Sequence, residues 1–314
     1  MTQRTIHVYH PRPEGLAERI RARAPDRPIV AWTEEAQLRR GLGDVEVLFA
    51  PLPPRTGWTG ATRLALLQVA GAGVDHFLPS PDLPGTVQVA SLRGVFADDV
   101  ADHAMMLLLA LTRGLPQWLD QQRARVWKKR EVRRLRGRTV VVLGLGAIGR
   151  AVAARASACG MRVEGVRRRA EPAPGVSRVH RPEALADAAR GADALVVCVP
   201  RTPATEGLVD AAVIDALEDG AALIDVGRGG VVDEPALLSA VRAGRLLAGR
   251  DVFDEEPLPD DSPWWSAPNT IVTPHLAGLG EGYLDRAIDV LLDNVARLER
   301  GEALLHLVDR AAGY

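Results

Sequence analysis

A glycine-rich turn between a buried strand and a helix constrains this chain more than any other segment. Residues 139–143 read Thr-Val-Val-Val-Leu, the continuous apolar run of a strand that is buried on both faces. The turn Gly-Leu-Gly-Ala-Ile-Gly follows at 144–149, and a helix is expected to continue from it to Ala158. Strand and helix patterns then alternate as far as Thr273, which predicts a doubly wound parallel sheet.

The remaining pattern is of the same α/β type. In this second part we expect further strands at 162–166, 194–199, 221–226 and 270–273, with helices at 182–189, 211–217 and 234–242. The first part predicts strands at 6–9, 45–50 and 64–69, a helix at 14–23 and a long helix at 97–112. Apolar residues cover almost every face of the long helix, so we expect it to be buried. A length of 314 residues is typical of two domains.

The glycines of the turn suit a dinucleotide site. Gly144 permits the tight turn, Gly146 lets the backbone approach a pyrophosphate, and Gly149 allows close packing of the helix. The N–H groups at the start of the following helix attract phosphate. The alternative is a strand–helix turn that binds no ligand.

The end of the next strand indicates which dinucleotide is bound. An NAD site places an acidic residue there, about 20 residues after the motif. Glu164 has that spacing, but Gly165 and Val166 follow it, so we expect it inside the strand and Arg167-Arg168-Arg169 at the strand end. Arginine pairs with a 2′-phosphate, which predicts NADP, with NAD still possible. The alternative is three solvated arginines.

Two polar residues in the last third follow expected strands. Arg228 comes after the strand at 221–226, and His275 comes after the strand at 270–273. Ligands bind at the carboxyl ends of parallel strands, so both side chains are expected to converge on one crevice. Glu256 lies between them in an acidic loop. Each residue alone also suits a structural turn, and it is their joint arrangement that predicts a catalytic site.

With these residues, the chain resembles the D-isomer-specific 2-hydroxyacid dehydrogenase family over most of its length. The motifs occur in family order: VAGAGVDHF (69–77), GVFADDVADHA (94–104), VVVLGLGAIGR (140–150), CVPRTPATEGLV (198–209), DVGRGGVVDEPALL (225–238), DVFDEEPLPDDSPWW (251–265) and TPHLAG (273–278). The ending VDRAAGY (308–314) and the arginines at 167–169 are most similar to the glyoxylate/hydroxypyruvate reductase members.

The resemblance implies two Rossmann-like doubly wound domains. Residues 1–96 and 280–314 would form a discontinuous substrate domain, and residues 97–279 an inserted dinucleotide-binding domain. The family's catalytic arginine, glutamate and histidine fall on Arg228, Glu256 and His275. Its carboxylate-binding backbone falls on Ala72 and Gly73. Its cofactor contacts fall on Gly144, Gly146, Ala147, Ile148, Gly149, Arg167, Arg168, Arg169, Val199, Pro200, Val226, Gly227, Asp251 and Gly278.

Three positions depart from the family pattern. Asp102 replaces its usual acid in VAEH, and His306 replaces its usual asparagine near the C-terminus. The stretch 246–250 before Asp251 is one residue shorter than usual and carries an unexpected Arg250.

These residue types suit reduction of a 2-oxo acid. Arg228 can bind the carboxylate and polarise the ketone, while backbone N–H groups near Ala72 and Gly73 take the other carboxylate oxygen. Protonated His275 can protonate the ketone oxygen as hydride arrives, and Glu256 favours the imidazolium. We expect an NADPH-dependent enzyme that reduces a glyoxylate- or hydroxypyruvate-like acid to the D-2-hydroxy acid. Alternatives are an NAD-linked 2-hydroxyacid or phosphoglycerate-type dehydrogenase, and a dinucleotide-sensing corepressor.

Composition and apolar runs indicate which other partners and locations to expect. A net charge of −1 argues against nucleic acid as the main partner. The longest apolar run, residues 104–111, is too short to cross a membrane, and the N-terminus lacks an apolar signal region. The two cysteines predict no disulfide framework, no Cys-based zinc site and a cytoplasmic location. The basic segment 123–138 is expected to be solvated, the histidines at 7, 10, 76, 180 and 306 to lack acid partners, and the resemblance implies a homodimer.

Overall fold

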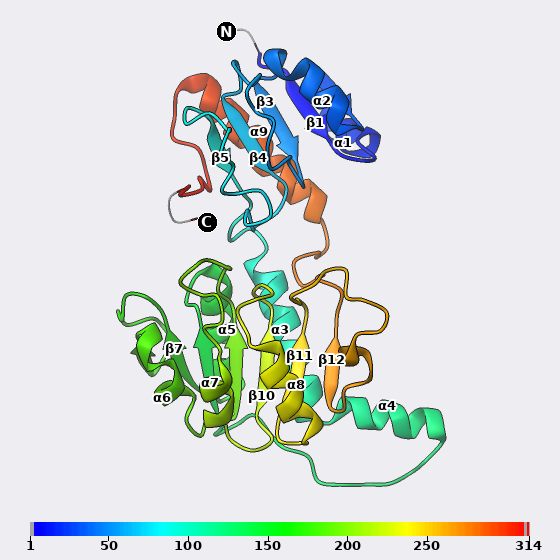
Figure 1. Cartoon of the computed structure of the whole chain (residues 1–314), viewed down its shortest axis with the longest axis vertical. Coiled ribbons are helices and arrows are strands. Elements are labelled where there is room, and N and C mark those ends of the chain that lie inside the picture. The colour runs from blue at the N-terminus through cyan, green and yellow to red at the C-terminus, as the bar shows by residue number, and fades with distance from the viewer. Residues whose placement is uncertain (1–2, 311–312, 314) are drawn as a thin grey trace. The chain divides into compact units, whose positions relative to one another are not determined.

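The computed structural model describes residues 3–310 and residue 313, and the chain divides into two compact units (Figure 1). The first unit contains the residues up to Phe96 together with those from Gly280 onward, and the second unit is Ala97–Leu279. Residues 311, 312 and 314 of the ending VDRAAGY lie outside the described residues.

The first unit is a parallel sheet with helices on both faces. Its strand order is β2-β1-β3-β4-β5, and the strands are β1 (Ile6–Tyr9), β2 (Ile29–Trp32), β3 (Val47–Ala50), β4 (Leu66–Val69) and β5 (Gln88–Ala90). Its helices are α1 (Glu14–Arg23), α2 (Glu35–Gly41), the short 3₁₀ turn Leu42–Asp44 and α9 (Tyr283–Arg300). Alternate residues of the central strands face opposite sides, so Phe49 joins one apolar cluster and Leu48 joins the other.

Helix α9 returns the C-terminal segment to this sheet. Its buried stripe includes Ile288, Leu291 and Val295, which pack against β1, β3 and α1. Each fully buried side chain of this kind stabilises the fold by about 1.5–3 kcal/mol. Buried Asn294 donates to Gln68 Oε1 at 2.8 Å and accepts from the Leu305 N–H at 2.7 Å, so α9 and the segment after it are tied to β4.

The second unit is a seven-stranded parallel sheet in the order β12-β11-β10-β9-β6-β7-β8. Its strands are β6 (Thr139–Leu143), β7 (Arg162–Val166), β8 (Arg178–His180), β9 (Ala194–Val197), β10 (Ala222–Asp225), β11 (Leu247–Arg250) and β12 (Thr270–Val272). Its helices are α3 (Ala97–Thr112), α4 (Leu115–Ala124), α5 (Ala147–Ala158), α6 (Leu185–Ala189), α7 (Ala211–Ala216) and α8 (Glu234–Arg242), with 3₁₀ turns at Pro182–Ala184 and Pro263–Ser266.

Two apolar layers cover this sheet. Val140 and Val142 of β6 pack with residues of α3 and α5, whereas Val141 and Leu143 pack with residues of α6, α7 and α8. From β6 the chain first builds β7 and β8 on one side and then crosses to β9 on the other. The strand order therefore reverses between β6 and β9, which is where doubly wound sheets bind ligands.

The predicted α/β class with two Rossmann-like parallel sheets is confirmed, and several predicted elements have the expected bounds. The prediction that α3 is buried on almost every face is wrong, because Met106 and Leu109 are 46% and 40% exposed. One stripe of this helix packs on the sheet and another is exposed. Within the described residues, no helix has the length and apolar character needed to cross a membrane, and no group of acidic, His or Cys side chains is arranged to hold a metal.

Candidate active site

The polar residues of the second unit come from three neighbouring strands. β10, β11 and β12 are adjacent and parallel, so their carboxyl ends share one edge of the sheet. Arg228 follows β10, Asp251 follows β11 directly, and His275 follows β12. The fold therefore brings to one edge the residues that the sequence placed after separate strands.

His275 and Glu256 form a short hydrogen-bonded pair. Nδ1 of His275 lies 2.6 Å from Oε2 of Glu256, and Oε1 of Glu256 accepts the Phe253 N–H at 2.9 Å. Burial raises the pKa of Glu256, but the hydrogen bonds from His275 and Phe253, with the charges of His275 and Arg228, lower it below its ordinary value overall. Glu256 is therefore an ionised acceptor that orients the imidazole.

The backbone of His275 is held in a left-handed conformation, with φ at 50°. Its N–H donates to the carbonyls of Asp251 at 2.9 Å and Thr273 at 3.1 Å. The buried carboxylate of Asp251 accepts from the Thr273 hydroxyl at 2.6 Å and from the N–H groups of Leu276 and Ala277 at 3.0 and 2.9 Å. These bonds fasten the turn and sustain a conformation that non-glycine residues rarely adopt.

His103 of α3 supports the same turn. Its Nε2 lies 3.0 Å from the Thr273 hydroxyl and 3.6 Å from Oδ1 of Asp251. Burial lowers the pKa of His103, while the Asp251 charge opposes that shift. His103 is therefore a partly buried histidine with polar partners beside the turn that carries His275.

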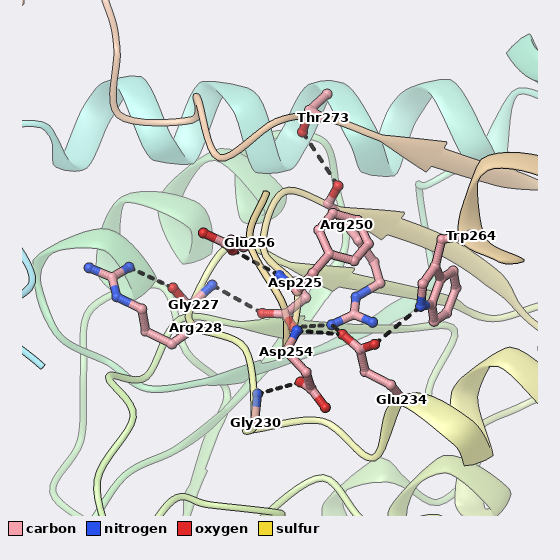
Figure 2. Close-up of polar contacts among 11 residues, drawn as sticks. Asp225, Gly227, Arg228, Gly230, Glu234, Arg250, Asp254, Glu256, Trp264 and Thr273 are labelled. Atoms are coloured by element: carbon pink, nitrogen blue, oxygen red, sulfur yellow. Dashed lines mark hydrogen bonds and ion pairs between the residues drawn. The ribbon is translucent and has the colours of Figure 1, made fainter. Parts of the chain in front are cut away.

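The loop that carries Arg228 is held through its backbone (Figure 2). Arg228 donates from its guanidinium to the Gly227 carbonyl at 2.7 Å, and the Gly227 N–H donates to Asp225 Oδ1 at 3.1 Å. The Gly230 N–H donates to Asp254 Oδ1 at 2.6 Å. Both ends of the loop are thus attached to carboxylates.

The glycine turn has the geometry of a phosphate site. Gly144 has φ at 96°, and a Cβ there would lie 2.8 Å from a Val199 methyl. A Cβ on Gly149 would lie 1.7 Å from the Gly144 carbonyl oxygen, so the start of α5 packs directly on the turn. Apart from the two neighbouring residues of the chain, no described atom lies within 4 Å of a Cβ placed on Gly146, and α5 begins at the next residue, Ala147. The N-terminal N–H groups of α5, which includes Ile148, can therefore meet a phosphate.

The arginines at 167–169 follow β7, and Glu164 lies within that strand as expected. The Arg167 guanidinium donates to the carbonyl and the carboxylate of Glu171 at 2.8 and 3.2 Å, whereas Arg168 and Arg169 are exposed. The prediction that His180 lacks an acid partner is wrong, because its Nε2 lies 2.7 Å from Glu164 Oε2. The pair forms because β7 and β8 are adjacent and parallel, which residue spacing alone did not reveal.

The other expected contact residues divide between the units. Val199 and Pro200 follow β9, Val226 follows β10, and Gly278 follows β12, all at the carboxyl edge of the second sheet. Ala72 and Gly73 lie in the first unit, in the turn after β4.

Comparison with known protein families identifies the segment that carries these residues. Residues 105–277, more than half of the chain, match the family described as D-isomer specific 2-hydroxyacid dehydrogenase, NAD binding domain. The chain belongs to this family. It is therefore one of the NAD(P)-dependent oxidoreductases.

Similar proteins include reductases and dehydrogenases of this family. The chain is 31% identical to glyoxylate/hydroxypyruvate reductase A of Photorhabdus laumondii, with 83% of this chain and 85% of that protein covered. It is 34% identical to a D-3-phosphoglycerate dehydrogenase of Mycobacterium leprae over 77% of this chain, but spans only about half, 46%, of that enzyme. The family structure from Xanthobacter autotrophicus Py2 in complex with NADPH and MES is 32% identical, with a TM-score of 0.89 over the full length of both chains.

A group of charged side chains at the end of β11 was not predicted from the sequence. Arg250, the last residue of β11, is fully buried beside Asp225 and Glu234. Arg250 stood out in the sequence only as a residue unexpected in the family. Its acidic partners lie on β10 and α8, and only the folded sheet brings them together.

Asp225 titrates unusually in this environment. Burial raises its pKa from 3.8 to about 7, with smaller contributions from Glu234 and Asp254, although the Arg250 charge and the Gly227 N–H oppose the rise. The folded chain therefore binds this proton more tightly than the unfolded chain does. Because of this group, the free energy of unfolding decreases as pH rises from about 4 to about 7.

We expect Asp225→Asn to remove this cost, because the amide stays neutral and its oxygen can still accept from Gly227. The wild-type free energy of unfolding should fall relative to the variant by up to about 1.4 kcal/mol per pH unit in that range. Urea unfolding of both proteins at about pH 5 and about pH 7 measures the difference. Parallel pH dependences would show that Asp225 does not titrate there.

Proposed function

We propose that this chain is an NADPH-dependent reductase of a small 2-oxo acid of the glyoxylate or hydroxypyruvate type, forming the D-2-hydroxy acid. The observation that carries the proposal is the 2.6 Å pair of His275 and Glu256 at the sheet edge that also carries Arg228. An acid–base group, its orienting carboxylate and a carboxylate-binding cation are the residue types that this reduction needs.

The proposed roles follow from the chemistry of each side chain. Arg228 binds the substrate carboxylate and polarises the ketone with its fork of donors. Glu256 contacts Nδ1 of His275, so Nε2 is the ring atom that donates a proton to the ketone oxygen. The nicotinamide, when bound, supplies the hydride. The backbone of Ala72 and Gly73 remains a prediction for carboxylate binding.

The cofactor assignment rests on the second unit, which we propose as the dinucleotide-binding domain, with the first unit as the substrate domain. Gly144, Gly146 and the start of α5 would hold the pyrophosphate, and the arginines at 167–169 the 2′-phosphate. The similar Xanthobacter structure contains NADPH. The residues Val199, Pro200, Val226, Asp251 and Gly278 are proposed to line the same cofactor site.

Two other functions are alternatives: another dehydrogenase activity of the family, and a non-enzymatic sensor. An NAD-linked or phosphoglycerate-type dehydrogenase is supported by the Mycobacterium leprae relative, of which this chain spans about half. A dinucleotide-sensing corepressor is disfavoured because Arg228, Glu256 and His275 are all present.

The exposed apolar side chains of α3, α4 and the segment after them support a homodimer through the second unit. They are Met106, Leu109, Leu115, Leu119, Val126 and Trp127, the last 93% exposed. Burial of such a surface between two copies is a common basis of dimers. A cytoplasmic dimer is part of the proposal, and a monomer in sedimentation equilibrium would contradict it.

The proposed activity is tested by initial rates. We expect turnover of glyoxylate or hydroxypyruvate with NADPH, and slower turnover of pyruvate and phenylpyruvate, each measured with NADPH and NADH. Saturable cofactor binding without turnover of any of these acids would favour the sensor.

His275→Gln should keep cofactor binding and lose turnover, because glutamine cannot supply the proton. General acid catalysis accounts for about 100-fold to 10,000-fold in rate. The matched control is His180→Gln, since His180 has a similar 2.7 Å contact with Glu164 but lies on the edge strand β8. If kcat of His275→Gln stays within about tenfold of wild type, the assigned role is wrong.

The wild-type chain should bind NADPH at least about tenfold more tightly than NADH, because charge-assisted hydrogen bonds to phosphate contribute about 1.5–3 kcal/mol each. Replacing Arg167 and Arg168 together by Asp should reverse the preference. Arg162→Gln removes a cation from the opposite end of β7 and should not change it. Competing titrations decide, and equal wild-type affinities would mean that the arginines form only a solvated turn.

A further inference from the structure

Arg250 is a buried cation that the proposed chemistry does not use. It is 0% exposed, and its guanidinium lies 2.7 Å from Glu234 Oε1 and 3.6 Å from Asp225 Oδ2 (Figure 2). Charged side chains are almost never fully buried unless they are paired. This position at the end of β11 therefore has a specific partner set.

Two aromatic rings complete the surroundings of the guanidinium. Its central carbon lies 4.8 Å from the ring centroids of both Phe253 and Trp264, within the range of cation–π attraction. The Trp264 indole N–H also donates to Glu234 Oε2 at 3.3 Å. Ion pairs and ring contacts thus surround the guanidinium, while its three nitrogens make no hydrogen bond to a described residue.

The acidic partners of Arg250 connect to the Arg228 loop at both of its ends. Asp225, which pairs with Arg250, accepts the Gly227 N–H through its other oxygen at 3.1 Å. The second connection runs from the Glu234 carboxylate to the N–H of Asp254 at 2.9 Å, and from the Asp254 carboxylate to the N–H of Gly230 at 2.6 Å.

The loop that bears Glu256 belongs to the same assembly. A Cβ on Gly229 would lie only 1.9 Å from the Phe253 carbonyl oxygen, so the two loops touch backbone to backbone. The Phe253 N–H in turn donates to Glu256 at 2.9 Å. A shift of either loop therefore moves both Arg228 and Glu256.

Arg250 is the cation that permits this crowding of acids. The charges of Glu234 and Asp254 raise the pKa of Asp225, and the Arg250 charge acts against that effect. Removing one partner of a buried ion pair leaves an uncompensated charge, which is strongly unfavourable. Without Arg250, the carboxylates that hold Gly227 and Gly230 would repel one another.

We propose that Arg250 is a positioning residue that sets the Arg228 loop against the Glu256 loop through Asp225, Glu234 and Asp254. This inference rests on the proposed function, since it assigns Arg250 a task in that reaction without contact to substrate or cofactor. It also accounts for an arginine that the family pattern does not lead one to expect.

The test compares Arg250→Leu and Arg250→Lys with the control Arg245→Leu. Arg245 lies just before the other end of β11, where its guanidinium donates to the carbonyls of Ile214 and Leu217 at 2.8 and 3.2 Å. Two readouts are used: steady-state kinetics with glyoxylate and NADPH, and hydrogen exchange of the amides of Gly227 and Gly230. Arg250→Lys keeps the positive charge beside Glu234, and it replaces Arg250→Leu as the test variant if the leucine variant does not fold.

We expect Arg250→Leu to lower kcat/KM by about tenfold to 100-fold, because small misplacements of substrate-binding groups have such effects. NADPH affinity should fall less than kcat/KM, and exchange of both glycine amides should accelerate. Arg250→Lys should recover part of each loss. Arg245→Leu should lower stability without changing kcat/KM or these two amides.

Wild-type kinetics and wild-type amide exchange in a folded Arg250 variant would overturn the inference. The same losses in Arg245→Leu would overturn it too, because they would reflect general destabilisation. Absence of 2-oxo-acid turnover by the wild-type chain would instead defeat the proposed function. The exchange of Gly227 and Gly230 would then still decide whether Arg250 positions the loop.

Discussion

The parallel pairing of β10, β11 and β12 is the constraint on which the site depends. Asp225 pairs with Arg250, and Arg250 pairs with Val272, so the last residues of three strands form one row. Arg228 and His275 each lie three residues beyond that row, and Asp251 lies one residue beyond it. A slip of register would separate these groups, and the buried apolar faces of the strands oppose such a slip.

Two carboxyl groups near this row, Glu256 and Asp225, differ in how their pKa values are shifted. Glu256 stays ionised beside His275, while Asp225 is pushed toward its neutral form by burial. The difference arises from the surroundings, because Glu256 receives hydrogen bonds from a histidine and a backbone amide, and Asp225 lies among other acids. One carboxylate can therefore orient an imidazole while another tolerates complete burial near a cation.

Much of this arrangement was predictable from sequence, for identifiable reasons. Strands β1, β6 and β7 and helices α1, α3 and α8 have their expected bounds, because apolar runs and helical periodicity mark them. The edge strand β8 (Arg-Val-His) was missed because it is not an apolar run, and β11 because its Leu-Ala-Gly-Arg segment ends in a cation. Strand β2 was not predicted although its sequence, Ile-Val-Ala-Trp, is apolar. Strand β5, of three residues, and helices α2, α4 and α9 were not predicted either.

At the site, too, residues in local sequence motifs were predictable and contacts between distant residues were not. Arg228, Glu256 and His275 stood out because each lies in a motif with a known order in the family. The pairs Arg250–Glu234 and His180–Glu164 join residues 16 apart along the chain, and no local pattern marks them. Such contacts arise from strand order and burial, which only the folded sheet defines.

The contact of Gly229 with Phe253 has a consequence for how this protein can change. Because no side chain fits between the two backbones, the sequences of segments 225–238 and 251–265 cannot change independently of each other. A chimera that takes one segment from a relative and keeps the other would combine two surfaces that were never matched. In this chain, exchange of either segment therefore requires a matching change in the other.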